Sequence, residues 1–134
     1  MVQTRPIIQK LDIPFDIKEI GVGTSANAAG GNQYYARMFD PTKFNAKTIK
    51  FATTLSQTNV GTYNVYAQLY DATHYALVTG TQLTANLAQY ANSPQISGDI
   101  KANLFQGLHL YDLVIWVDAG GQVAARNACI LVTI

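Results

Sequence analysis

Residues 62–71 read TYNVYAQLYD, and the alternation within this stretch decides the fold class. One set of alternate residues is apolar: Tyr63, Val65, Ala67 and Leu69. The intervening set is polar or aromatic: Asn64, Tyr66, Gln68 and Tyr70. Because successive side chains of a β-strand point to opposite faces of a sheet, this period of two predicts a strand with one face in a core.

The same period recurs along the chain, in residues 47–56, 111–117 and 124–134. Glycines in residues 118–122 predict a hairpin turn that joins the last two of these strands. Further turn signals recur often enough to predict about eight short strands, and no long stretch keeps the spacing of a helix. We therefore expect an all-β fold, an antiparallel two-sheet sandwich, and within that class we favour a jelly roll.

Residues 1–20 differ from the rest, since their apolar side chains follow no clean period and surround two prolines. We expect an extended N-terminal arm here, then a Gly/Ala-rich hinge over residues 21–31 and the β-sandwich domain over residues 32–134. The arm has two interpretations: an edge strand along its own domain, or a segment that docks on a neighbouring subunit. The second interpretation predicts these anchors: Ile7, Ile8, Leu11, Ile13 and Phe15.

Aromatic side chains fall on the predicted strand faces that point away from the core. Tyr66 and Tyr70 lie opposite the apolar set of their strand, and Trp116 lies opposite Ile115. A loop of the same domain, another subunit or a sugar ring could cover such side chains, because Tyr and Trp supply a large contact area at low entropic cost. We predict that Tyr66, Tyr70 and Trp116 belong to an interface.

Residues capable of chemistry are few and scattered. His74 and His109 fall on separate elements with no third metal ligand at a recognisable spacing, so we interpret them as turn and surface histidines. Glu19 is the one glutamate and Cys129 the one cysteine. Asp118 beside loop carbonyls is a weak calcium candidate, because no alternating Asp or Asn residues accompany it. We expect a protein that is not an enzyme and has no catalytic, cofactor or metal site.

Composition and charge narrow the range of partners. The chain has 134 residues, of which 49% are hydrophobic and 13% charged, and its formal net charge is +1. A net charge this small creates no electrostatic field that would attract nucleic acid or an anionic membrane. It also causes only weak repulsion between copies of the chain, so charge does little to prevent self-association. We find no apolar stretch of transmembrane length and no signal peptide, so we expect synthesis in a host cytoplasm and no membrane partner.

Three stretches carry a resemblance to a known group of proteins: residues 62–80, Ser97 to Ile100, and Tyr111 to Val117. Together they resemble the small jelly-roll sandwich proteins of tailed-phage particles, which include head-decoration, head-fibre and tail accessory proteins. The resemblance implies a non-enzymatic virion protein that forms a homo-oligomer, with a trimer favoured. It also implies capsid or other virion proteins as partners, and a terminal segment that fixes the protein to the particle.

Two functions from different classes follow from this reasoning. The first is a virion structural or decoration protein that assembles through its β-sandwich and its N-terminal arm. The alternative is a carbohydrate- or receptor-binding β-sandwich module, for which a glycan would be the partner.

Overall fold

The computed structural model describes residues 10–15, 19–24 and 37–134, and ten strands make up most of that part of the chain. The strands are β1 (Lys10–Pro14), β2 (Glu19–Gly21), β3 (Arg37–Phe39), β4 (Thr48–Gln57), β5 (Thr62–Asp71), β6 (Ala76–Leu77), β7 (Leu83–Ala88), β8 (Asn92–Ile96), β9 (His109–Val117) and β10 (Val123–Thr133). Two single-turn 3-10 helices complete the described elements: η2 (Pro41–Lys43) and η3 (Lys101–Asn103).

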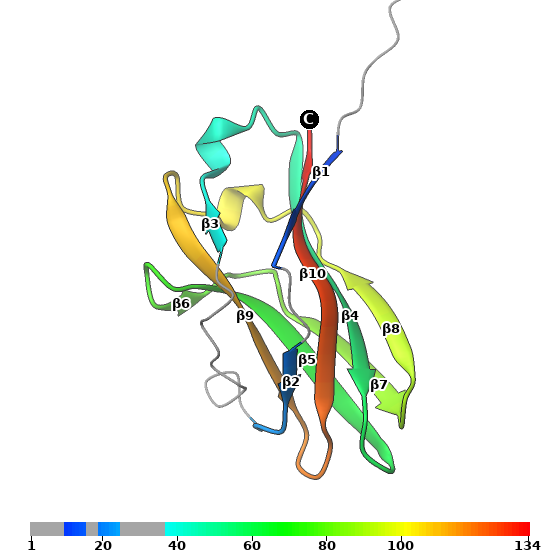
Figure 1. Cartoon of the computed structure of the whole chain (residues 1–134). Helices are drawn as coiled ribbons and strands as arrows, with labels where there is room; N and C mark the ends of the chain where they lie inside the picture. Colours follow the sequence, from blue (N-terminus) through cyan, green and yellow to red (C-terminus); the bar gives the residue numbers. More distant parts are fainter. Residues whose placement is uncertain (1–9, 16–18, 25–36) are drawn as a thin grey trace, which may run out of the picture.

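The strands form two antiparallel sheets that pack as a sandwich (Figure 1). One sheet has the order β1-β10-β4-β8, with β2 also paired to β10, and the other has the order β3-β9-β5-β6, with β7 also paired to β5. If β1 and β2 are taken as one interrupted strand and the short β6 is set aside, eight strands stand in the orders 1-8-3-6 and 2-7-4-5. This is the strand order of a jelly roll, so the expected all-β sandwich is confirmed.

The core lies between the two facing sheets. It contains the alternate side chains of the long strands that the sequence pattern predicted to point inward. The inward residues of the four long strands are at most 3% exposed. They are Ile49, Phe51, Thr53 and Leu55 of β4, Val65, Ala67 and Leu69 of β5, Tyr111, Leu113, Ile115 and Val117 of β9, and Ile130 and Val132 of β10. Burial of each large apolar side chain contributes about 1.5–3 kcal/mol, so these strands hold the two sheets together.

Part of the predicted N-terminal arm belongs to this sandwich. In the antiparallel pair β1–β10, Leu11 stands opposite Val132 and Ile13 opposite Ile130, while Phe15 donates its backbone N–H to the Ala128 carbonyl at 2.9 Å. The sandwich therefore begins at residue 10 and not at residue 32. For residues 10–15 the structure matches the edge-strand interpretation, because the open edge of β10 offers backbone hydrogen bonds that an extended segment can accept.

The two sheets are also linked at the edge where β1 and β3 lie. The Arg37 guanidinium, on β3, donates from Nε to the Pro14 carbonyl of β1 at 2.9 Å. The hinge predicted at residues 21–31 begins in strand β2 with Gly21, and its residues 25–31 lie outside the described part of the chain.

Candidate functional site

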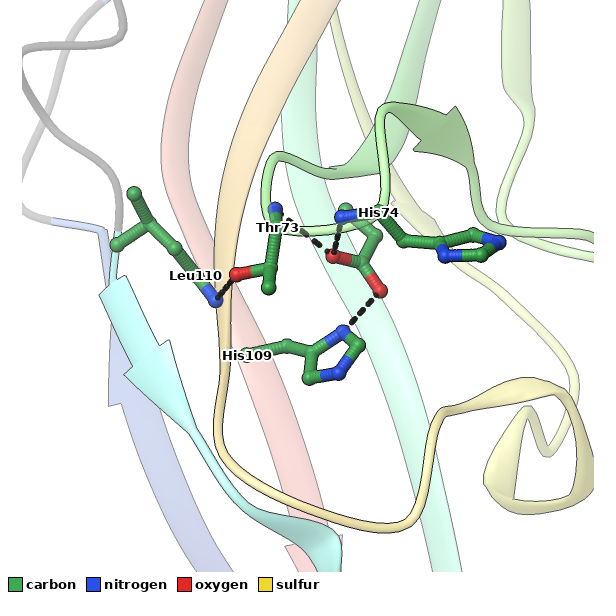
Figure 2. Close-up of polar contacts among 5 residues, drawn as sticks. Thr73, His74, His109 and Leu110 are labelled. Atoms are coloured by element: carbon green, nitrogen blue, oxygen red, sulfur yellow. Dashed lines mark hydrogen bonds and ion pairs between the residues drawn. The ribbon is translucent and has the colours of Figure 1, made fainter.

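One end of the sandwich gathers polar and aromatic side chains around Asp71, the last residue of β5. Its Oδ1 accepts hydrogen bonds from the backbone N–H groups of Thr73 and His74, at 3.1 and 3.0 Å. Its Oδ2 lies 2.7 Å from Nδ1 of His109, the first residue of β9. Figure 2 draws this contact as a dashed line. A short aspartate side chain at a strand end satisfies turn amides in this way, so the carboxylate both caps the turn and orients the imidazole.

Backbone contacts hold this turn against β9. The Ala72 N–H donates to the Leu110 carbonyl at 2.8 Å. The Leu110 N–H donates to the Thr73 hydroxyl at 2.8 Å, and Figure 2 draws this second bond. Because Asp71 and His109 are only 3% and 18% exposed in their side chains, their contact is shielded from solvent on most sides. The result is a rigid corner where the end of β5 meets the start of β9.

Phe105 joins the two histidines into one cluster. Its ring centroid lies 4.2 Å from that of His74 and 4.9 Å from that of His109, and the second pair is stacked with an interplanar angle of 16°. His74 is an exposed turn residue, as expected, whereas His109 is largely buried, and the structure brings the two histidines together through Phe105. Their proximity depends on the β8–β9 connection, which brings Phe105 to the β5–β6 turn, and no local pattern in the sequence signals that contact.

Tyr111 forms the buried floor beside this cluster. Its side chain is 0% exposed, and its hydroxyl has no hydrogen-bond partner among the described residues. Burial, reinforced by the nearby carboxylates of Asp71 and Asp40, raises the pKa of Tyr111 to about 12. The nearby backbone of Phe105 opposes this rise, although its geometry falls short of a hydrogen bond. A buried unpaired hydroxyl costs about 1–3 kcal/mol, so this site departs from what stability alone would favour.

A cavity of about 240 Å³ opens beside these residues, bounded by the β5–β7 connection on one side and the η3–β9 connection on the other. Its lining consists of Asp71, His74, Ala76, Leu77, Val78, Thr79, Asn103, Phe105 and Tyr111. The Asn103 side-chain N–H donates to the Thr79 carbonyl at 3.0 Å, which ties the two walls together. The cavity thus combines apolar walls with a few hydrogen-bonding groups, and no Lys or Arg contributes to it.

A second group of residues occupies the outer face of the sheet that contains β3, β9 and β5. The rings of Tyr66 and Trp116 stack there with centroids 5.0 Å apart and an interplanar angle of 6°. The Tyr66 hydroxyl donates to Asp118 Oδ1 at 3.1 Å, and Asn64 donates from Nδ2 to Asp118 Oδ2 at 2.9 Å. Burial first, and then the contact with Asp118, raises the pKa of Tyr66.

The stacked rings end a longer apolar row, which we call the outer-face row. Cross-strand register places Met38 opposite Leu110, Tyr70 opposite Asp112 and Gln68 opposite Val114 on the same face. The outer-face row comprises Met38, Leu110, Tyr70, Val114, Trp116 and Tyr66. Met38 is 53% exposed and the other five are half-buried, so the predicted outward direction of Tyr66, Tyr70 and Trp116 is the one in the structure.

One buried carboxylate interrupts the outer-face row. Asp112 is 2% exposed, and its Oδ1 accepts the backbone N–H of Leu113 at 2.7 Å. Burial raises the pKa of Asp112, and the Leu113 hydrogen bond partly opposes the rise. In strands β3, β5, β6, β7 and β9, all of them described, no other charged side chain lies on this face.

The predicted arm anchors that the structure describes differ in how deeply they are buried. Phe15 is 1% exposed and packs in the core of its own sandwich, which leaves little of its surface for another subunit. Ile13 is half-buried against the same core, whereas Leu11 is 40% exposed on the edge strand. Ile7 and Ile8 lie outside the described residues, and their role stays a prediction.

Within the described part of the chain, no group of three or more His, Cys, Asp or Glu side chains is arranged to hold a metal ion. In the same part, no helix has the length and apolar character needed to cross a membrane.

The chain has few detectable similarities to known proteins. No family model matches the chain, and no curated protein is significantly similar to it. A chain in the solved structure of infectious bursal disease virus, Gx strain, is similar with a TM-score of 0.37 and 14% sequence identity. The similarity covers 97% of this chain and 32% of that one, so this chain spans about a third of its length. At that score and identity, the similarity supports no argument about function.

Proposed function

We propose that this protein is a non-enzymatic structural protein of a virion, which assembles with further copies of itself through the outer-face row. The finer form of the proposal is a decoration or accessory protein of a tailed-phage particle, organised as a trimer and bound to capsid or other virion proteins. The N-terminal residues before β1, with Ile7 and Ile8, are its proposed attachment to the particle.

The observation that carries the proposal is the composition of the outer-face row. It presents two stacked aromatic rings and four further apolar or aromatic side chains on one sheet face. Interface cores are depleted in charge and enriched in Tyr, Trp and Met, which is the composition found here. The stacked pair of Tyr66 and Trp116 would supply the central anchor, since aromatic residues dominate interface energetics.

The electrostatic properties of the chain also favour association with like copies. Its formal net charge is +1, so long-range repulsion between copies is weak. Asp112, the one charged strand residue on this face, is already buried, so a partner would have little of its carboxylate left to desolvate.

The virion setting is supported by two further points. Jelly rolls are common in viral capsid proteins, although the same fold serves lectins and cupins and does not determine function. The resemblance of residues 62–80, 97–100 and 111–117 to small proteins of tailed-phage particles points in the same direction.

The oligomeric state tests the assembly proposal. We expect light scattering coupled to size-exclusion chromatography to show a stable oligomer, with a trimer as the finer expectation. Met38→Lys, at an exposed edge-strand position, should introduce charge into the interface without unfolding the domain, and Trp116→Ala should weaken association by about 30-fold or more. Tyr90→Ala serves as the control, because Tyr90 is 71% exposed in the turn that follows β7.

The outcomes separate the two functions inferred from the sequence. An oligomer that Met38→Lys and Trp116→Ala dissociate, and that Tyr90→Ala leaves intact, supports assembly through the outer-face row. A chain that stays monomeric at every concentration refutes assembly and leaves the carbohydrate- or receptor-binding alternative. Loss of particle binding on removal of residues 1–9, with the oligomer unchanged, would support the attachment role of that segment.

A further inference from the structure

We propose that strand β7 pairs with β7 of a second copy of this chain, so that one sheet continues across a twofold axis into the neighbour. β7 lies at a border of its sheet, where it pairs with β5 (Figure 1). This contact uses the edge of the sheet and not its outer face, so it goes beyond the assembly proposed for the outer-face row.

The hydrogen bonds of β5 determine which backbone groups of β7 face outward. The Asp118 N–H donates to the Asn64 carbonyl at 3.0 Å, on the β9 side of β5. The Val78 N–H donates to the Leu69 carbonyl at 2.9 Å, on the opposite side. Because successive residues of a strand direct their backbone groups to alternate sides, the even-numbered residues of β5 bond toward β9 and the odd-numbered ones toward β7.

The register between β5 and β7 extends this alternation to the edge of the sheet. Asn64 stands opposite Asn86, and Tyr66 stands opposite Thr84. Since Asn64 and Tyr66 bond toward β9, the backbone N–H and C=O groups of Thr84, Asn86 and Ala88 point away from β5. The side chains of these three residues are exposed, and within the described part of the chain no bond outside the sheet ladders engages the backbone of Thr84 or Asn86.

The other long edges of the described sheets are protected against strand pairing. Pro14 in β1 and Pro94 in β8 have no N–H to donate. β1 also contains Lys10 and Asp12, and β3 is three residues long and begins with Arg37. Charged residues, proline and short length are the usual features that keep an edge strand from pairing. β7 reads LTANLA, with no charge and no proline over six residues, so its edge is open to strand addition.

A twofold axis at Asn86 makes this edge complementary to itself. In the antiparallel arrangement, Asn86 stands opposite Asn86 of the second copy, and Thr84 stands opposite the second copy's Ala88. Both are hydrogen-bonded pairs, because the N–H and C=O groups of these residues face the edge. The facing side chains are uncharged, so the axis brings no like charges together, and a formal net charge of +1 adds only weak repulsion.

The two faces of the sheet match in the same register. Ala85 stands opposite the second copy's Leu87 on the inward side, where Leu87 is 8% exposed and Ala85 half-buried. The outward side pairs Thr84 with the second copy's Ala88. A continuous sheet requires that paired residues share one face, and a shift by one residue would oppose inward side chains to outward ones. A second copy therefore meets both the hydrogen-bonding and the burial requirements of β7.

Oxidative cross-linking of the full-length chain tests the register. Paired residues of this kind have Cα atoms about 5.5 Å apart, which lies within the range that a disulfide spans. Cys129 is the native thiol, so the variants also contain Cys129→Ser. We expect Asn86→Cys to form a disulfide-linked dimer. Asn92→Cys, at an exposed position of the neighbouring edge strand β8, is the matched control and should stay unlinked.

Hydrogen exchange and light scattering test the pairing without a cross-link. In the Trp116→Ala background we expect a dimer in which the amides of Thr84 and Asn86 are protected, and the protection should disappear on dilution. Asn86→Pro removes an N–H that points away from β5, so the ladder with β5 is retained while dimerisation weakens at least about tenfold. Asn92→Pro makes the same change on β8 and should leave dimerisation unchanged.

Either of two results overturns the proposal. The first is an Asn86→Cys variant that cross-links no more than Asn92→Cys. The second is an amide exchange rate at Thr84 and Asn86 that does not depend on protein concentration. The Trp116→Ala background separates this contact from the outer-face row. A dimer that persists there supports β7 pairing, whereas complete dissociation to monomers supports assembly through the row and overturns β7 pairing.

Discussion

Replacement of Phe15 by alanine tests whether the segment before β2 stabilises its own domain or a neighbouring one. Phe15 is 1% exposed and contacts the core of its own sandwich. Truncation of a buried phenylalanine costs about 3–5 kcal/mol through lost burial and the cavity left behind. For a domain of this length that loss corresponds to a fall in Tm of roughly 10–20 °C. Because Phe15 contributes its backbone N–H to the Ala128 carbonyl, that hydrogen bond survives the substitution.

Leu11→Ala on the same strand is the matched control, since Leu11 is 40% exposed. We expect it to cost about 1 kcal/mol, in keeping with partial burial. Urea unfolding followed by the fluorescence of Trp116, the one tryptophan, gives both free energies of unfolding. A loss for Phe15→Ala no larger than that for Leu11→Ala, accompanied by dissociation of an oligomer, would refute the reasoning and restore the intermolecular arm.

Two further predictions concern packing and charge. A Cβ atom at Gly121 would lie 2.6 Å from Val117 Cγ2 and 2.8 Å from Tyr63 Cγ, so Gly121→Ala should cost about 1–3 kcal/mol by urea unfolding. Gly98→Ala, whose Cβ meets nothing within 4 Å, should stay within about 0.5 kcal/mol of the wild type, and equal losses for the two variants would contradict the packing argument. Burial raises the pKa of Asp112 above its ordinary value of 3.8, so the folded state disfavours the carboxylate. The loss of stability therefore builds up as pH rises from the ordinary pKa through the folded pKa. Asp112→Asn should therefore have a higher Tm than the wild type at neutral pH, with the difference vanishing near about pH 4, and a difference independent of pH would exclude this cause.

The sequence correctly predicted those features that depend only on adjacent residues of one strand or turn, such as the direction of a side chain. The direction of Val65, Ile115 and Trp116 follows from the alternation of a pleated strand, and each points as predicted. The turn at residues 118–122 follows in the same way from its glycines. The strand type, and hence the sandwich, could be inferred because burial of one face imposes this local pattern, whereas the described part of the chain has ten strands and not the expected eight or so.

The N-terminal segment shows where such inference ends. Its apolar residues indicated that something must cover them, but not whether the cover belongs to the same chain. Phe15 packs in its own core because β10 has an open edge beside it and the sheets leave room there, and neither condition can be read from residues 1–20 alone.

By itself, the sequence determined the all-β class, the inward and outward faces of the long strands and the low charge of the chain. The tertiary structure alone decided which strands are neighbours, and therefore which distant residues meet. His109 and Asp71 are 38 residues apart, and they form a 2.7 Å contact only because β9 pairs with β5. The physical reason is that periodicity reports a residue's environment, whereas the contact between two particular residues depends on strand order and loop closure across the whole domain.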